Sequence, residues 1–224
     1  DWRLPPFAAS KLVEVPKNGI VDKEFRNRQQ LAATFVVRGL GGAVLPDLPN
    51  TVGIAAKGPK LAYDARNGNI RLMNGKAEAE FTYTVTAAGL PKVSELEAIT
   101  LNNLPKDIRQ FTEIPDPPPA VQGLLDQAPD GSAWAKFDFL RNWILGNLPG
   151  DEDGVTAKGT GQPKSVTPER VADMIAGNRE GTPFEIVAAQ AMLARYIGVP
   201  SRIGYGFDGG EEVNGKIEVR PKHG

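Results

Sequence analysis

The chain lacks cysteine altogether, and this absence removes several kinds of chemistry at once. Among its 224 residues there is also only one histidine. Disulfides, thiolate zinc sites and cysteine nucleophiles are therefore excluded, and so is any metal site built from several histidines. The glycines of 204–210 do not form a phosphate-binding loop, because no helix is expected after them. We expect no cofactor.

Long apolar runs are missing too. No stretch approaches the roughly 20 apolar residues of a membrane-spanning helix, and no signal peptide is visible. The formal net charge is −1, so nothing indicates binding to nucleic acid. The first residue is not methionine, and the sequence stops shortly after a strand expected at Lys216–Arg220, with no turn or cap. We interpret the sequence as a piece cut from a larger protein.

The composition indicates a globular chain with a hydrophobic core. Hydrophobic residues make up 41% and charged residues 24%, and the length suits one large domain or two small ones. Basic residues are in excess over residues 1–112 and acidic residues over residues 113–224. This contrast favours two units.

Residues 1–112 have the pattern of a β domain. From Glu78 to Thr86, apolar and polar residues alternate strictly, which predicts a strand with one buried face. Asn74-Gly75 before it is a strong hairpin-turn signal. Further strands are expected at Thr34–Arg38, Val52–Ala56, Leu61–Tyr63, Ile70–Met73 and Val93–Thr100. Short strands at such spacing predict a small sandwich or barrel-like unit, in which we see no catalytic residues.

A proline-rich run at Ile114–Pro119 ends this region, because such a run fits neither a helix interior nor a central strand. Beyond it the pattern becomes helical. Helices are expected at Ala120–Gln127, at Ala133–Gly146, from Thr167 to about Gly177, and from Phe184 to Tyr196. Strands are expected at Ser201–Phe207 and Lys216–Arg220, joined by a turn segment at Asp208–Gly215.

The helix from Phe184 to Tyr196 is the most informative element. It is apolar on almost every face, which is typical of a buried central helix. Thr182-Pro183-Phe184-Glu185 before it predicts a capping box, with Thr182 as the cap and Glu185 three residues later. Pro183 then takes the first helical position, where its missing N–H is not needed.

Residues Gly181–His223 resemble the bacterial transglutaminase-like superfamily in the order of their elements. The best match is Leu193-Ala194-Arg195-Tyr196-Ile197-Gly198-Val199-Pro200-Ser201-Arg202, which is similar to the segment after that family's nucleophile helix. The resemblance extends over about half of the chain. It implies an α+β, papain-like thiol fold, truncated here at its C-terminus, after an N-terminal β-rich domain. The domains would be 1–112 and 113–224.

The resemblance also implies a catalytic triad, of which this sequence keeps one member at most. Counting back from Ala194-Arg195, the family's cysteine falls at Pro183, which has no nucleophile and no N–H. His223 lies where the family has its general base, and we interpret it as a remnant base, although it could also be an ordinary histidine. The partner Asp would lie beyond Gly224. Thr182 carries the only hydroxyl near this position and is the candidate for a substitute nucleophile, although capping is the ordinary role of such a hydroxyl.

The leading hypothesis is therefore a non-catalytic transglutaminase-like module that binds a protein, peptide or cell-wall ligand. Bacterial members of the family are often parts of membrane-anchored proteins, which implies a place on the extracytoplasmic face of the membrane. The alternatives are an acyltransferase or peptidase-like enzyme with a substituted nucleophile, and a purely structural ectodomain whose cleft is filled. Acidic loops at Asp151–Gly154 and Asp208–Glu212 could hold Ca²⁺, but neither has EF-hand spacing and both fit solvated loops.

Overall fold

The computed structural model describes residues 12–16, 29–39, 42–64, 69–74, 80–148, 166–178, 180–204, 206 and 210–220. It is a mixed α+β structure of two compact units, which divide between Pro91 and Lys92. Helices that follow this division contact helices of the second unit. The boundary that composition placed between residues 112 and 113 stays a prediction from the sequence. The two units are described separately below.

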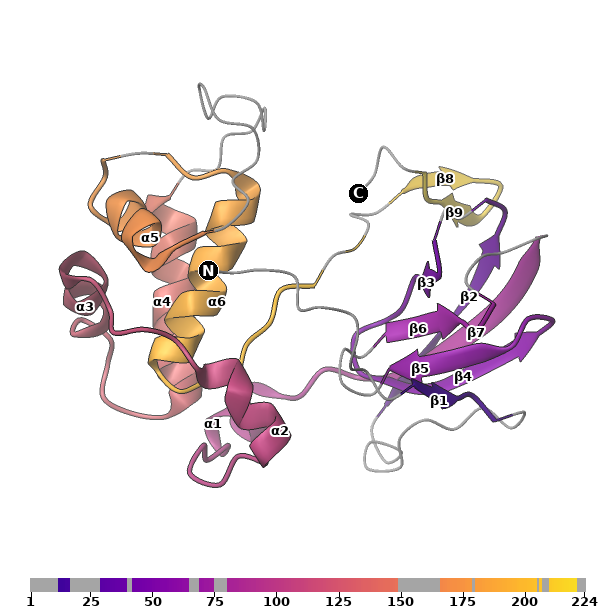
Figure 1. Cartoon of the computed structure of the whole chain (residues 1–224), viewed down its shortest axis with the longest axis horizontal. Helices are drawn as coiled ribbons and strands as arrows, with labels where there is room; N and C mark the ends of the chain where they lie inside the picture. The colour runs from indigo at the N-terminus through magenta and orange to yellow at the C-terminus, as the bar shows by residue number, and fades with distance from the viewer. Residues whose placement is uncertain are drawn as a thin grey trace. The chain divides into compact units, whose positions relative to one another are not determined.

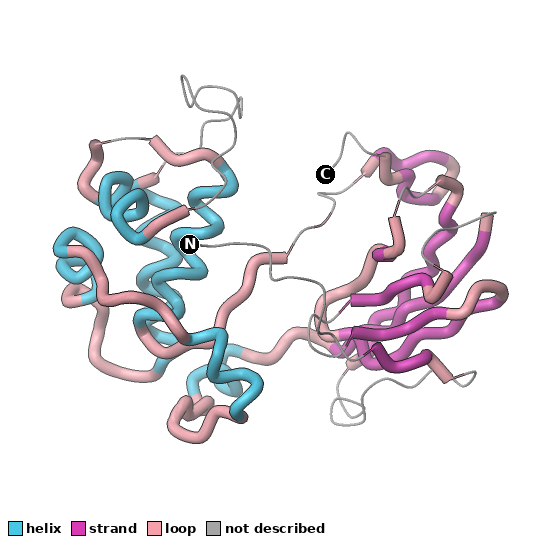
Figure 2. Tube along the Cα trace, viewed as in Figure 1, coloured by secondary structure: helices cyan, strands magenta, loops and turns pink. Residues whose placement is uncertain are grey.

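The first unit consists of antiparallel β-sheet (Figures 1 and 2). Its strands are β1 (Leu12–Glu14), β2 (Gln30–Val37), β3 (Val44–Leu45), β4 (Thr51–Lys57), β5 (Leu61–Asp64), β6 (Asn69–Leu72) and β7 (Phe81–Ala88). They form a four-stranded sheet in the order β1-β5-β6-β3 and a three-stranded sheet in the order β2-β7-β4. Each sheet contributes buried side chains to one shared core, so the unit is a small sandwich.

Strand β7 shows why the alternating sequence forms this sheet. Phe81, Tyr83, Val85 and Ala87 are buried, while the threonines between them face outward. The buried Tyr83 ring stacks on Phe35 of β2 with centroids 5.1 Å apart. Its hydroxyl donates a hydrogen bond to the Pro46 carbonyl oxygen at 2.6 Å. The period-2 pattern is confirmed for the part of the predicted strand that is described, whereas residues 75–79 lie outside the described residues.

The second unit is mainly helical. Its elements are α1 (Val93–Glu97), α2 (Lys106–Arg109), the 3₁₀ turn η2 (Gln110–Thr112), α3 (Pro119–Leu125), α4 (Ala133–Asn147), α5 (Pro168–Ile175) and α6 (Pro183–Tyr196), with a hairpin of β8 (Glu211–Val213) and β9 (Lys216–Glu218). Helix α6 packs against α3, α4 and α5. Its Ala188, Ala189, Met192 and Leu193 lie in one core with residues of those three helices. The prediction of a buried central helix is confirmed.

Three expectations from the sequence are wrong in this unit. Residues 93–97 are a helix and not a strand, because the Lys92 N–H donates to Glu95 Oε2 at 2.7 Å and caps a helical turn. Residues 201–204 form no strand, since Ser201 is held by side-chain and backbone bonds to other segments. The expected turn at 208–215 contains strand β8.

The β8–β9 hairpin has the loop that its sequence specifies. Val213 and Lys216 pair across a two-residue loop, Asn214-Gly215. The φ angles of these two residues are 53° and 71°, the left-handed values that a type I′ turn requires at both positions. No helix in the described part of the chain is both long and apolar enough to cross a membrane.

Candidate functional site

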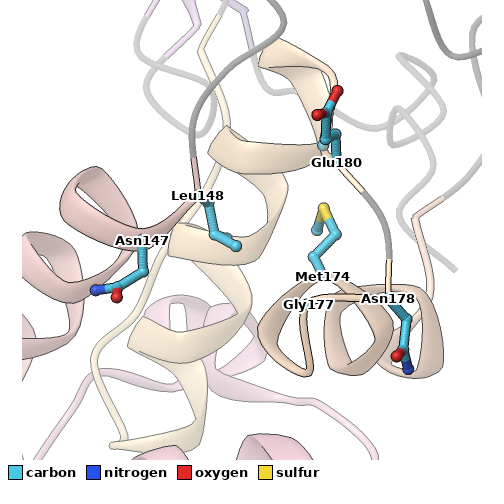
Figure 3. Close-up of a pocket in the computed structure, with 7 residues that line it drawn as sticks. Asn147, Leu148, Met174, Gly177, Asn178 and Glu180 are labelled. Carbon is cyan, nitrogen blue, oxygen red and sulfur yellow. The ribbon is translucent and has the colours of Figure 1, made fainter.

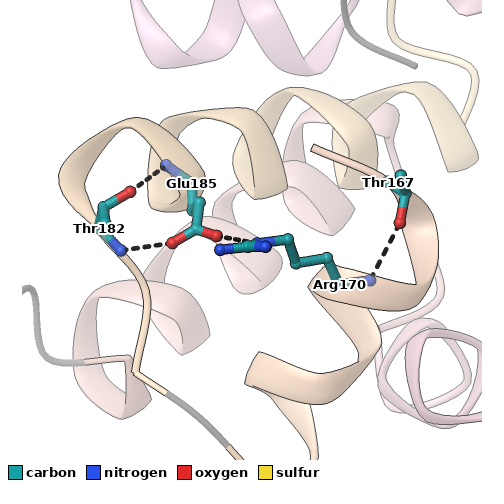
Figure 4. Close-up of polar contacts among 4 residues, drawn as sticks. All are labelled: Thr167, Arg170, Thr182 and Glu185. Atoms are coloured by element: carbon teal, nitrogen blue, oxygen red, sulfur yellow. Dashed lines mark hydrogen bonds and ion pairs between the residues drawn. The ribbon is translucent and has the colours of Figure 1, made fainter. Parts of the chain in front are cut away.

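The start of α6 is the position at which the resemblance seen in the sequence leads us to expect a nucleophile. Figure 4 shows that it is instead a complete capping box. Thr182 Oγ1 accepts a hydrogen bond from the Glu185 N–H at 3.3 Å, and the Thr182 N–H donates to Glu185 Oε2 at 2.8 Å. Pro183, which is exposed, occupies the first helical position. The capping box expected from the sequence is confirmed.

An arginine from α5 completes the arrangement. The Glu185 side chain is fully buried, and Arg170 Nε donates to its Oε1 in an ion pair (Figure 4). Both carboxylate oxygens of Glu185 therefore have partners, as a buried charge requires. Arg170 itself lies in a capped first turn, because its own N–H donates to Thr167 Oγ1 at 3.3 Å. The two helix starts are thus tied together through one buried carboxylate.

Sequence reasoning missed Arg170. The signal was indirect: an acidic residue inside an almost wholly apolar helix needs a cationic or donor partner if it is buried. Arg170 stands 15 residues before Glu185, which is no helical or strand spacing, so the partner could not be chosen from the pattern alone.

At the start of α5, the N–H of Glu169 and the Thr167 hydroxyl lower the pKa of the exposed Glu169 carboxyl.

These contacts define what the helix start does chemically. The Thr182 oxygen is engaged as a cap acceptor, and proline at 183 supplies neither a nucleophile nor an N–H for an oxyanion. His223 lies outside the described residues, so the structure does not place the expected remnant base. Of the predicted site residues, the structure places Thr182 and Pro183 at the start of α6. Glu185 and Arg170 lie beside them and complete the arrangement.

A cavity of about 260 Å³ adjoins this helix start (Figure 3). It lies among the C-terminal ends of α4 and α5 and the segment that leads into α6, and its lining residues are Asn147, Leu148, Met174, Gly177, Asn178, Glu180 and Gly181. Figure 3 shows the Leu148 and Met174 side chains directed into the space between these ends. Both are buried, so the cavity has an apolar floor and a polar rim.

Gly181 brings this cavity and the capping box together. A Cβ at this position would lie 2.6 Å from Met174 Sδ and 3.1 Å from Ile186 Cγ1. The backbone before Thr182 therefore passes close to Met174, and a larger residue would push that side chain. No sequence pattern indicated the cavity, because its walls come from chain ends that are distant in the sequence.

The segment that carries the family resemblance has a structural role here. Arg195 donates to the Glu113 carbonyl at 3.0 Å and to the Ser201 carbonyl at 2.8 Å. Ser201 Oγ donates to the Ala191 carbonyl at 2.6 Å. Burial lowers the pKa of Arg195, and the nearby Glu113 charge opposes this shift. These bonds fix the chain that enters and leaves the helical core, and they place no reactive group near Pro183.

The acidic loops expected from the sequence provide no metal site in the part of the chain that is described. Asp151–Gly154 and residues 207–209 lie outside the described residues. Within the part that is described, no group of three or more Asp, Glu or His side chains is placed to hold a metal ion. Trp143 packs against the helical core.

Comparison of the chain with protein-family models, with curated proteins and with solved structures finds no match.

Proposed function

We propose that residues 113–224 form a transglutaminase-like module that has lost thiol chemistry and binds a ligand at the cavity beside α6. The observation that carries the proposal is the pairing of an inert helix start with an adjoining cavity. Thr182, Pro183 and Glu185 are committed to capping and ion pairing. Side chains of the described residues nevertheless do not fill the space next to them.

The cavity favours a polypeptide as the ligand among the protein, peptide and cell-wall ligands that the resemblance implies. Its volume of about 260 Å³ is below the roughly 300–1,000 Å³ of sites that enclose a whole drug-sized molecule. It suits one apolar side chain, seated on Leu148 and Met174, of a ligand that continues outside. Asn147, Asn178 and Glu180 are the polar residues among those that line the cavity. One Asn147 donor is already used, since Nδ2 bonds the Trp143 carbonyl at 2.8 Å.

The test is an NMR titration of the isotopically labelled chain with short peptides and with cell-wall peptide fragments. Peptides with an apolar side chain should shift the amide resonances of Met174, Gly177 and Gly181. Asn178→Trp, at an exposed rim position, should cover the cavity and abolish the shifts. Asn142→Trp is the matched control, because Asn142 is exposed on α4 and does not line the cavity. Equal peptide binding by Asn178→Trp and Asn142→Trp would contradict the proposal.

The enzyme alternative is tested with the same protein. Incubation with acyl-donor peptides and an amine should give no turnover. If product forms, Thr182→Ala against Thr182→Ser decides whether the Thr182 hydroxyl attacks, because serine keeps both the hydroxyl and the cap. Turnover that persists in Thr182→Ser and vanishes in Thr182→Ala and His223→Ala would replace the binding proposal with an enzymatic one.

The extracytoplasmic, membrane-tethered location is a further part of the proposal, and it rests on the family resemblance alone. A cysteine introduced at the exposed Asn142 of the parent protein should react with a membrane-impermeant maleimide on intact cells. Labelling only after lysis would contradict this location.

A further inference from the structure

Strand β2 is an edge of the three-stranded sheet, and no other described strand pairs with its outer side. Its eight residues, Gln30–Val37, carry no charge. The opposite edge, β4, has a register irregularity between Thr51 and Gly53 and ends in Lys57. In the other sheet the edge strands β1 and β3 have only three and two residues. Short length, charge and irregularity are the usual protections of an edge, and among the described strands only β2 is a long edge without them.

The register shows which backbone groups of β2 point outward. Gly89 N–H donates to the Gln29 carbonyl at 2.6 Å, which makes these residues a hydrogen-bonded pair in line with the β2–β7 register. Such pairs alternate along an antiparallel ladder. Ala32, Thr34 and Val36 therefore direct their N–H and C=O groups away from β7. Within the described part of the chain, no hydrogen-bond partner meets these backbone groups.

We propose that β2 pairs antiparallel with β2 of a second copy of this chain, with Thr34 on the two-fold axis. In this register Thr34 lies opposite the second copy's Thr34, and Ala32 lies opposite its Val36. The outward groups of one strand meet the outward groups of the other, so the hydrogen-bonded ladder continues across the axis. The same face of each sheet stays on the same side.

The side chains favour a second copy over an unrelated strand. Pairing of an uncharged strand with itself brings no like charges together. Leu31 has the same parity as the core residue Val37 of β2, but it is 65% exposed. In the dimer it would lie opposite the second copy's Val37, at the edge of that copy's core. The charge of Arg38, at the end of the strand, is already paired with Glu80 at 3.0 Å.

The experiment uses Thr34 and Ala55, which flank Thr84 from the two edges of the sheet. The chain has no cysteine, so Thr34→Cys and Ala55→Cys each introduce a single thiol. Mild oxidation should convert Thr34→Cys to a covalent dimer and leave Ala55→Cys largely monomeric. Cα atoms of a hydrogen-bonded pair are about 5.5 Å apart, which is within the range of a disulfide.

Sedimentation equilibrium gives the second readout. The full chain should form a reversible dimer at micromolar concentration. Thr34→Lys, which places two like charges side by side on the axis, should raise the dimer Kd by at least about tenfold. Ala55→Lys should leave the Kd unchanged, and circular dichroism should show both variants folded. A monomeric wild-type chain overturns the proposal. So does a dimer that is insensitive to Thr34→Lys or cross-links faster through Ala55→Cys.

Discussion

Replacing Arg170 by methionine tests how the start of α6 is held. In the native chain the Glu185 carboxylate has an exposed fraction of 0% and the Arg170 side chain one of 26%. Arg170→Met keeps the apolar stem but removes this cation from the carboxylate. A buried charge without its partner costs about 3–5 kcal/mol, so the free energy of unfolding of the helical unit should fall by this amount.

A second substitution separates this cause from lost packing. Glu185→Gln removes the negative charge but keeps an oxygen that accepts the Thr182 N–H. The double variant Arg170→Met/Glu185→Gln should therefore recover most of the loss and lie within about 1–2 kcal/mol of the native chain.

Urea unfolding measures both effects. Circular dichroism at 222 nm follows the helices, and the fluorescence of Trp134 and Trp143 reports on α4. The reasoning is refuted if Arg170→Met costs less than about 1 kcal/mol, or if the double variant is less stable than Arg170→Met. In either case the ion pair does not hold the helix start.

Three further predictions concern single positions. Thr182→Ala should lower the free energy of unfolding by about 0.5–2 kcal/mol, whereas Thr182→Ser should be nearly neutral in the same urea titration. Gly181→Ala should displace Met174 into the cavity, cost about 1–3 kcal/mol and weaken peptide binding by NMR, because the new Cβ would lie 2.6 Å from Met174 Sδ. Burial raises the pKa of Asp47 above 3.8, so the folded state binds its proton more tightly than the unfolded state does. The β unit should gain stability as pH falls through the raised pKa towards 3.8, and Asp47→Asn should flatten this dependence.

The elements that local sequence determines were predictable. Strict alternation specified β7, and the Thr182–Glu185 spacing specified the cap of α6. Asn214-Gly215 specified a hairpin turn, although the strand before it was missed. Helix α1 was misjudged as part of a strand over Val93–Thr100, although the apolar residues at 93, 96, 98 and 99 do not alternate with polar ones. Val93 is 56% exposed, and a local cap decides the conformation.

What depends on tertiary proximity was not predictable. The partner of Glu185 is on another helix, and the cavity is enclosed by the ends of α4 and α5 and by Gly181. No periodic pattern in the sequence indicates either the ion pair or the cavity. The open edge of β2 likewise follows from strand order, which a strand's own residues do not specify.

The most direct test of the proposed origin is to restore the thiol. Pro183→Cys gives a chain with one cysteine at an exposed helix start, where thiol pKa values fall to roughly 3.5–7.5. The pH dependence of iodoacetamide alkylation measures this pKa, with Ala55→Cys as the reference thiol. If the fold derives from a thiol enzyme, the thiol introduced by Pro183→Cys should have a low pKa, and adding His223→Ala should raise that pKa. A pKa that His223→Ala leaves unchanged would contradict it, because the helix start alone would then explain the thiol.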